Sequence, residues 1–521
     1  MAQVPPSMGR PLITPHGTLE VREPATGRLL GEVRVHGAAQ IAAAVAEARG
    51  AQADWGQRSF GERSAVILRV QQLLLDRAEA LCEHVSRESG KTRNEALLLE
   101  LLPLCDLLLC CCARGGEVLG EETSRPRLFP HKRSTLYRVP RGVVGIIGNH
   151  PLPLGGPVGD AALALLAGNA VVLKPSERAP IVAEKLRALF DEAGLPRGLF
   201  QVVHGAREAG DALIAAGIDF LLFSGSTASG RAVAHEAAER MLPCALRLSG
   251  KDPALVLADA DVQLAARRVA FGAFACAGQA AASISRCYVD ASIAGSFLDA
   301  LLAQARALVV GGTDDDGAHL GVVGTAEQLE LVQSQLEDAV ARGARILCGG
   351  EVKGGRLLAP TVVTQATHAM RLLREETRAP VLPVIEVASE AEAIRLANDS
   401  PFGLSASVFT RDGRRAARVA RELRVGAVLH DDVLFAAAIA ELPFAGLKQS
   451  AFGHAHGLQA LEELTELRAF HLEPFPLPAP WIFARGERAF RNGLRAGRAL
   501  LGGSWSARVQ GLLGVRRKPG R

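Results

Sequence analysis

Aromatic residues are scarce in this chain: they make up 4% of its 521 residues, with only two tyrosines and three tryptophans. The shortage argues against a protein that stacks nucleic-acid bases on aromatic side chains. No stretch reaches the roughly 20 uninterrupted apolar residues of a membrane-spanning helix. The N-terminus also has no apolar run after a basic segment. We therefore expect a cytoplasmic protein with a core rich in Ala, Leu and Val.

Paired cysteines are missing as well. The nine cysteines form no C-x-x-C pair, and no His/Cys cluster has the spacing of metal ligands. Cys110, Cys111 and Cys112 are adjacent, but they lie in an apolar run of helical character. We therefore predict buried free thiols and no metal site, which suits a reducing compartment.

Short apolar runs bounded by Gly or Pro alternate with helix-like segments. Residues 37–53 and 61–88, for example, carry apolar positions at helical spacing. The alternation predicts an α/β fold built from parallel β-α-β units, with a second series following the first. The expected strands are 143–147, 170–173, 220–223, 254–257 and 426–429.

Residues 274–286 read F-A-C-A-G-Q-A-A-A-S-I-S-R. This segment resembles the active-site segment of the aldehyde dehydrogenase superfamily, F-x-x-x-G-Q-x-C followed by an Arg, except at the cysteine. Further matches occur in family order between residues 20 and 473. They are E-S-G-K at 88–91, a first nucleotide-binding block at 140–180, F-S-G-S-T-A-S-G at 223–230, L-R-L-S-G-K at 246–251, N-D-S-P-F-G-L at 398–404 and L-P-F-A-G-L-K-Q-S at 442–450.

The resemblance implies an aldehyde dehydrogenase-like fold, with a Rossmann-type nucleotide-binding domain, an α/β catalytic-type domain and a bridging β-arm. The boundaries that we expect are 1–124 and 140–246 for the nucleotide-binding domain, 247–445 for the catalytic-type domain, 125–139 and 446–473 for the bridging and oligomerisation segments, and 474–521 for a Pro-rich link and a basic tail.

A cofactor site is predicted at the ends of two expected strands. Lys174 ends one strand, and Glu177 offers a carboxylate to a ribose hydroxyl. The turn at Gly225 and Ser226 leads into a helix-like segment, whose free N–H groups would face a pyrophosphate; the alternative is an ordinary capping turn. The resemblance adds Glu376 as a contact to the nicotinamide ribose. The implied cofactor is NAD, which Glu177 favours, with NADP as the alternative.

The catalytic positions implied by the resemblance are vacant. Family members use a cysteine nucleophile, a glutamate that activates water and an asparagine that holds the oxyanion. The cysteine position is Ala281 here, and a methyl group cannot attack an aldehyde. The glutamate position is Arg247, which stays protonated and cannot act as a base. The asparagine position is Pro151.

Substitutes for the lost groups are conceivable. A slip of one residue would bring Asn149 near the oxyanion position. Cys276, Cys287 and Ser283 flank the vacant nucleophile position, and His150 is a candidate base. Buried thiols are the better interpretation of the two cysteines.

The C-terminal 41 residues, from Trp481, contain ten Lys/Arg and one acidic residue. If 484–501 is helical, its arginines recur at three- and four-residue steps beside an apolar face. Such a helix could lie on an anionic membrane surface. The alternatives are a solvated or self-docked extension and a protein partner, whereas nucleic acid is not expected. The Pro-rich segment 474–480 would act as a semi-rigid spacer.

Three functions follow from these features. We favour a catalytically impaired, NAD(P)-binding homologue that regulates or scaffolds. The others are an active oxidoreductase that turns aldehydes into carboxylic acids with a relocated nucleophile, and a membrane-surface assembly protein that acts through its tail. Residues 128–139 resemble the family's bridging strands, and 465–472 resemble the strand that pairs with a partner subunit. We therefore expect a homo-oligomer, or a hetero-oligomer with an active homologue.

Overall fold

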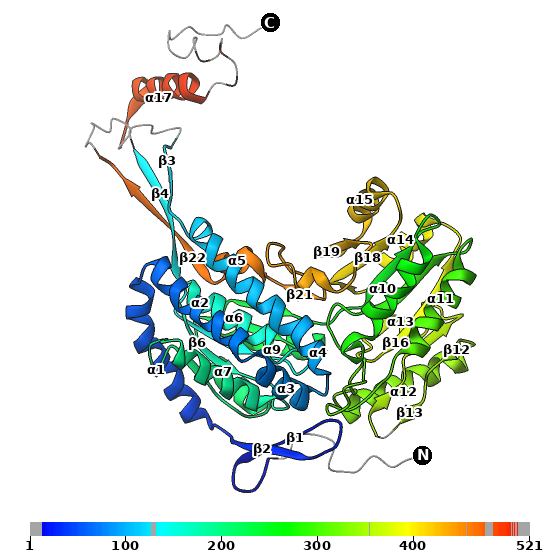
Figure 1. Cartoon of the computed structure of the whole chain (residues 1–521). Coiled ribbons are helices and arrows are strands. Elements are labelled where there is room, and N and C mark those ends of the chain that lie inside the picture. The colour runs from blue at the N-terminus through cyan, green and yellow to red at the C-terminus, as the bar shows by residue number, and fades with distance from the viewer. Residues whose placement is uncertain are drawn as a thin grey trace, which may run out of the picture. The chain divides into compact units, whose positions relative to one another are not determined.

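The computed structural model describes residues 13–126, 132–353, 355–454, 456–474, 483–501, 503, 505 and 508. The chain forms two compact units. The first comprises the chain up to Val118 and Pro140–Thr465, and the second comprises Leu119–Val139 and the chain from Glu466 onward. Figure 1 labels their helices and strands.

A six-stranded sheet in the order β21-β9-β8-β5-β6-β7 forms one core of the first unit (Figure 1). Five strands are parallel, and β21 pairs antiparallel with β9. Every residue of β5 and β6 is buried, as expected for parallel strands with helices on both faces. The strands are β5 (Val143–Ile147), β6 (Ala170–Lys174), β7 (Phe200–Val202), β8 (Phe220–Ser224), β9 (Cys244–Arg247) and β21 (Ala451–Phe452).

Three of the helices around this sheet begin at a side chain that caps them, namely Ser59, Thr92 and Ser226. Ser59 Oγ accepts the Glu62 N–H, and the Glu62 carboxylate accepts the Ser59 N–H at 2.8 Å, which is a capping box. The elements are β1 (Thr18–Arg22), β2 (Leu29–Arg34), α1 (Ala38–Gln57), α2 (Phe60–Asp76), α3 (Ala78–Ser89), α4 (Arg93–Ala96), the π-helix η2 (Leu97–Leu101), α5 (Leu102–Val118), α6 (Gly155–Leu166), α7 (Pro180–Glu192), α8 (Arg207–Ala215), α9 (Thr227–Glu239) and α16 (Gly457–Glu463).

The helical run Arg93–Val118 is, among the described residues, the one candidate for a membrane span by length and composition. Half of its apolar window is buried within the protein. Its main part, α5, packs against α2, α6 and α16. This packing is that of a core helix, which passes the same test of length and hydropathy.

A seven-stranded sheet in the order β12-β15-β16-β11-β10-β18-β19 forms the other core of the first unit. It is parallel except for β12, which runs antiparallel to β15. Successive side chains point to opposite faces: Ala254 and Val256 pack with α10 and α11, whereas Leu255 packs with α14 and α15. The strands are β10 (Asp252–Val256), β11 (Ile284–Asp290), β12 (Arg345–Cys348), β15 (Thr361–Thr364), β16 (Val381–Val387), β18 (Ser405–Phe409) and β19 (Ala427–His430).

Helices and short elements complete this half of the first unit. Figure 1 shows them in green and yellow. They are α10 (Val262–Phe274), η3 (Ala275–Gly278), α11 (Ala294–Ala307), α12 (Ala326–Ala341), β13 (Val352–Lys353), β14 (Leu357–Leu358), α13 (Arg371–Arg374), α14 (Glu390–Asn398), β17 (Phe402–Gly403), α15 (Gly413–Glu422), η4 (Phe435–Ala437) and β20 (Leu447–Lys448).

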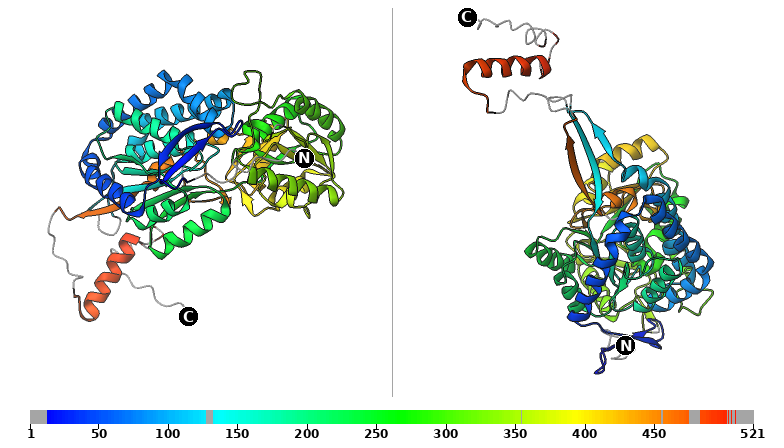
Figure 2. Two further views of the ribbon diagram at one scale, coloured as in Figure 1. Left: turned by 90° about the horizontal axis from the view of Figure 1, so that it is seen from below. Right: turned by 90° about the vertical axis from the view of Figure 1, so that its left-hand side faces the viewer.

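The second unit contains a three-stranded sheet in the order β22-β4-β3, and a separate helix, α17 (Figure 2). Ser134 Oγ and His471 Nδ1 lie 3.0 Å apart, and Lys132 pairs with Glu473 at 2.9 Å. No residue of α17 is buried. The elements are β3 (Glu122–Ser124), β4 (Arg133–Pro140), β22 (Thr465–Leu472) and α17 (Gly486–Leu501).

One expected boundary needs correction. The bridging segment predicted at 446–473 starts later, because β20, β21 and α16 pack in the first unit, which extends to Thr465. Residues 61–88, which carry apolar positions at helical spacing, fall in two helices, since Arg77 leaves the helical conformation at φ −112° and ψ 17°. Of the predicted spacer 474–480, all but Pro474 lies outside the described residues.

Candidate functional site

The carboxyl ends of β5, β6 and β8 form a crevice in the first sheet. The chain passes from β5 to β6 on one side and returns to β8 on the other. Such a switch in strand order is where open α/β sheets bind ligands. Asn149 follows β5, and its side-chain amide donates to Ser224 Oγ at the end of β8, at 2.7 Å. This hydrogen bond therefore joins the ends of β5 and β8 at the point where a dinucleotide would cross the sheet.

Lys174 and Glu177 lie together at the end of β6. Lys174 Nζ is 3.3 Å from Glu177 Oε2, and Lys174 is almost fully buried. Burial acts to raise the pKa of Glu177, but Lys174, Arg178 and a backbone hydrogen bond together hold this pKa below its ordinary value. The pair thus offers a fixed ammonium and an ionised carboxylate, as the sequence predicts for ribose recognition.

The start of α9 and Glu376 are connected by hydrogen bonds. Ser226 caps α9, and Thr227 donates its N–H to Ser249 Oγ at 3.1 Å. Ser249 in turn donates to Glu376 Oε2 at 2.7 Å. The structure therefore brings together the turn after β8 and Glu376, both predicted to contact the cofactor.

The turn offers fewer free N–H groups than the sequence predicts. Gly225 N–H donates to Arg247 O at 3.0 Å, and Ser229 N–H donates to Ser226 Oγ at 3.2 Å. With Thr227 bonded to Ser249, three N–H groups of this segment already have partners within the protein. The helix dipole remains available to an anion, but the expectation of an open N–H cradle is corrected.

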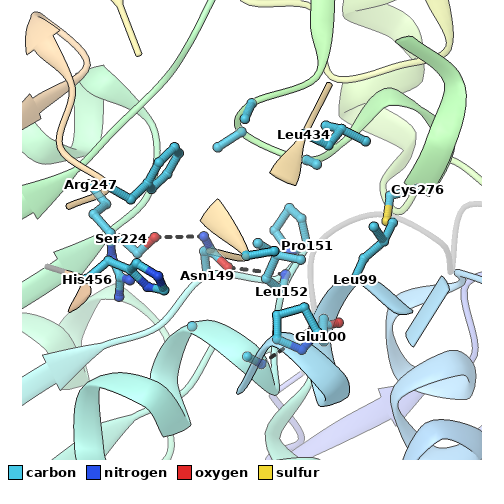
Figure 3. A pocket seen from close by; sticks show the side chains of 18 of the residues that line it. Leu99, Glu100, Asn149, Pro151, Leu152, Ser224, Arg247, Cys276, Leu434 and His456 are labelled. Carbon is cyan, nitrogen blue, oxygen red and sulfur yellow. Dashed lines mark hydrogen bonds between the residues drawn. The ribbon is translucent and has the colours of Figure 1, made fainter. Parts of the chain in front are cut away.

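A pocket adjoins the crevice, and all three vacant catalytic positions line it. Ala281, Arg247 and Pro151 share this pocket although they are far apart in the sequence. Figure 3 labels Arg247 and Pro151 in it. Most of the lining is apolar. Its large apolar side chains include Leu99, Leu107, Leu152, Leu434, Phe435 and Phe444.

Arg247 forms an ion pair with Asp160 of α6 at the wall of the pocket. Burial raises the pKa of Asp160 to about 6, although Arg247 acts in the opposite direction. Asp160 was not identified from the sequence. Its one signal is that it is the only charged residue in the apolar stretch that became α6.

Pro151 belongs to a loop fixed by buried charges. Its carbonyl accepts Lys91 Nζ at 2.6 Å, and Lys91 also pairs with Glu100. The other oxygen of Glu100 accepts the N–H groups of Leu154 and Gly155, both at 2.9 Å. These charges are fully engaged, so the loop is held by structure and not poised for proton transfer.

Among the proposed substitutes for the lost groups, Cys276 lines the pocket, where Asn149 also lies. Cys276 has a left-handed backbone with φ 53°, and its N–H donates to Glu95 Oε1 at 2.6 Å. Burial raises the pKa of the Cys276 thiol to about 12. At neutral pH this group is therefore a thiol and a poor nucleophile.

The other three substitutes lie elsewhere. Cys287 is part of the core between the second sheet and α10 and α11, and burial raises the pKa of its thiol even further. Ser283 is buried, and its hydroxyl has no partner among the described residues. His150 contacts the Glu88 carbonyl at 3.3 Å, and burial lowers its pKa to about 4.

His456 and Arg378 line the pocket but were not identified from the sequence. Figure 3 shows His456 next to Arg247. Burial lowers the pKa of His456 to about 4, and its Nε2 lies 3.3 Å from the Ile439 carbonyl. Arg378 donates to Glu376 Oε1 at 2.8 Å. Arg378 lies two residues after Glu376, in the segment that carries the resemblance, whereas His456 belongs to no motif and is revealed only by the tertiary structure.

Comparisons with known proteins agree with this geometry. The family described as "Aldehyde dehydrogenase family" matches residues 13–470. A protein of Methylomonas sp named 4,4'-diapolycopene aldehyde oxidase is 40% identical over 448 residues, which are 85% of this chain and 84% of that protein.

Solved structures are similar as well. The crystal structure of a Mycobacterium tuberculosis aldehyde dehydrogenase complexed with NAD+ has a TM-score of 0.84 and 32% identity, over 89% of this chain and 96% of that one. A cysteine-to-alanine mutant of the P. syringae indole-3-acetaldehyde dehydrogenase AldA, in complex with NAD+ and IAA, has a TM-score of 0.82 and 31% identity, over 87% and 93%.

Proposed function

Because the chain belongs to the aldehyde dehydrogenase family, we propose that it binds NAD(P) and an apolar ligand without oxidising aldehydes, and acts as a regulatory or scaffolding homologue. One observation carries the proposal: Ala281 and Arg247 line the same pocket. A nucleophile and a base are both needed to form and hydrolyse a thioester. Neither residue supplies one.

The cofactor part of the proposal rests on the crevice and on the relatives. Lys174 and Glu177 keep a charged pair at the end of β6, and Glu376 is bonded to the start of α9 through Ser249. The names of relatives include users of NAD+ and of NADP+. The cysteine-to-alanine mutant of AldA, solved with NAD+ and IAA, supports ligand binding in a family member that has lost a cysteine.

The apolar lining supports the class of ligand. Leucine and phenylalanine supply the large apolar side chains of the pocket wall, and such a surface favours a hydrocarbon chain over a small polar aldehyde. The relative from Methylomonas is named for 4,4'-diapolycopene aldehyde. We therefore propose a ligand with an extended apolar part.

A second candidate is an active oxidoreductase in which Cys276 replaces the lost nucleophile. The relatives are named as enzymes, and Cys276 lines the same pocket as Ala281. Against it stands the thiol pKa of about 12, which leaves roughly one thiolate in 10⁵ molecules at pH 7. The nearby Lys91 is already paired with Glu100.

Aldehyde turnover tests the proposal. The purified protein is mixed with NAD+ or NADP+ and short, long and aromatic aldehydes, and NAD(P)H is followed by absorbance. We expect no rate above background, and little gain from Ala281→Cys alone because Arg247 is not a base. Ala281→Cys with Arg247→Glu should gain more. Asp160→Asn is included in that variant so that two carboxylates do not face each other.

Activity in the unmutated protein would refute the proposal. Cys276→Ser then identifies the source of the activity. If this change abolishes turnover, the second candidate is correct.

A further inference from the structure

The guanidinium of Arg247 has N–H donors that are not bonded within the described part of the chain. Its Nη2 pairs with Asp160, whereas among the described residues neither Nε nor Nη1 has a hydrogen-bond partner. The side chain is 23% exposed, and it lines the pocket. These two donors are therefore open to a ligand in the pocket.

The other charged groups of the pocket are engaged. Glu100 is bonded to Lys91 and to two backbone N–H groups, and Arg378 is paired with Glu376. His456 lies beside Arg247, and burial holds its pKa near 4, so that it is neutral at pH 7. The polar end of the pocket thus combines a fixed cation with a neutral imidazole (Figure 3).

We infer that the pocket binds an apolar carboxylic acid, with the carboxylate held by Arg247 and the hydrocarbon held by the leucine and phenylalanine side chains. The inference rests on the proposed function and names its ligand class. An arginine presents donors in a planar fork that fits a carboxylate, and the charge strengthens each bond. An aldehyde or an alcohol of the same chain length offers no negative charge to the guanidinium.

The position of Arg247 explains why the pocket would prefer an acid. In the family resemblance, residue 247 is where the glutamate base stands, next to the carbon that becomes the acid. A carboxylate base would repel a bound acid, whereas Arg247 attracts it. An arginine in place of the glutamate therefore turns a site that releases an acid into one that retains it.

Asp160 limits the strength of this binding but does not prevent it. It shares the guanidinium with the ligand, so that two carboxylates lie on different edges of one cation. Because Asp160 is on α6 and is almost fully buried, it occupies its own side of Arg247 and leaves the pocket side free. The arrangement is that of an arginine between two acids.

Calorimetry with three ligands of equal length tests the inference: decanoate, decanol and decanal. We expect decanoate to bind at least tenfold more tightly than decanol, with decanal close to decanol. Arg247→Gln in an Asp160→Asn background keeps a neutral hydrogen-bonded pair in place of the ion pair. This variant should lose at least tenfold in decanoate affinity and keep its affinity for decanol.

Arg342→Gln is the matched control, because Arg342 lies outside the pocket and is paired with Asp338 at 2.8 Å. It should leave the preference for decanoate intact. Equal affinities for decanoate and decanol in the unmutated protein would overturn the inference. Full decanoate affinity in the Arg247 variant would overturn it as well. The two proposals fail separately: aldehyde turnover refutes the non-catalytic function, whereas loss of the acid preference refutes only the ligand class.

Discussion

Lys174 is the residue through which cofactor binding can be tested most directly. It is nearly buried at the end of β6, with Nζ 3.3 Å from Glu177. Lys174→Ala should weaken NAD+ binding about tenfold, because a hydrogen bond to a charged group contributes about 1.5–3 kcal/mol and a factor of ten is about 1.4 kcal/mol. Isothermal titration calorimetry up to millimolar NAD+ measures the change.

Lys132→Ala serves as the control for charge, since Lys132 pairs with Glu473 in the second unit. It should leave the dissociation constant unchanged. Equal losses in both variants, or no heat of binding in the unmutated protein, would contradict the cofactor site.

Glu88 should make stability depend on pH. Burial raises its pKa to about 8, although its carboxylate accepts the N–H groups of Ile181 and Val182 at 2.9 and 2.7 Å. The folded protein then keeps a proton that the unfolded chain releases above its ordinary pKa near 4.5. Stability therefore falls as pH rises from about 4.5 to 8, by at most about 1.4 kcal/mol per pH unit.

Urea unfolding at pH 5, 6, 7 and 8 checks this expectation. Glu88→Gln should make the fall shallower, because Gln does not titrate. Part of the slope should remain, since burial also raises the pKa of Asp252 to about 7. An unchanged slope in the variant would show that Glu88 is ionised in the folded protein throughout this range.

The site residues that belong to motifs could be identified from the sequence. The residues that contact them only in the folded protein could not. Ala281, Arg247 and Pro151, which the family resemblance assigns to one catalytic site, line one pocket. Asp160 and His456 also meet Arg247, but they lie far from it in the chain and carry no local pattern. Only the packing of α6 and of the segment before α16 brings them there.

Strands were easier to predict than the turns between them. β5 coincides with the expected run 143–147, and β6 and β8 extend their runs by one residue. Apolar composition and flanking Gly or Pro are local signals, which explains the agreement. The left-handed residues Cys276 and Ala277 gave no such signal, because non-glycine residues adopt that conformation only under tertiary constraint.

Helix α17 has the composition of a membrane-surface helix. Arg488, Arg491 and Arg495 follow one another at three- and four-residue steps, while Phe490 is 67% and Leu494 42% exposed. We propose that it binds anionic bilayers, and we expect co-sedimentation with anionic vesicles at low salt. Each basic residue near the surface contributes about 1 kcal/mol. Binding should weaken as the Debye length falls from about 10 Å at 0.1 M to about 3 Å at 1 M salt.

Truncation after Glu473 should abolish this binding without unfolding the first unit. Changing the three arginines to glutamine should weaken it strongly and keep the apolar face intact. Zwitterionic vesicles are the control for charge. If the truncated and full-length proteins bind anionic vesicles equally, the tail is a solvated extension or serves a protein partner.

At the scale of the whole molecule, β22 is the feature that calls for a partner chain. It is an edge strand of its sheet, and seven of its eight residues are exposed, including Leu467 at 57% and Phe470 at 53%. An apolar edge of this kind pairs readily with another strand. We therefore expect light scattering at micromolar concentration to give the mass of a dimer or a larger assembly.

Leu467→Lys with Phe470→Lys should shift the mass toward the monomer. Leu29→Lys with Leu68→Lys, which makes the same number of changes at exposed leucines of the first unit, should not. A strictly monomeric unmutated protein would refute self-association. Co-purification with a catalytically active homologue would instead support the hetero-oligomer that a regulatory subunit requires.

The shape of the pocket wall depends on the number of residues in the π-helix Leu97–Leu101. It lies between α4 and α5, and such single-turn bulges commonly mark functional sites. Since each residue advances an α-helix by about 100°, deleting one residue here would rotate Leu99 and Glu100 out of their present directions. Lys91 would then lose its ion pair with Glu100, and the pocket would lose the wall that Leu99 and Glu100 form. A deletion of one residue here should therefore reshape the pocket in a way that no single substitution can.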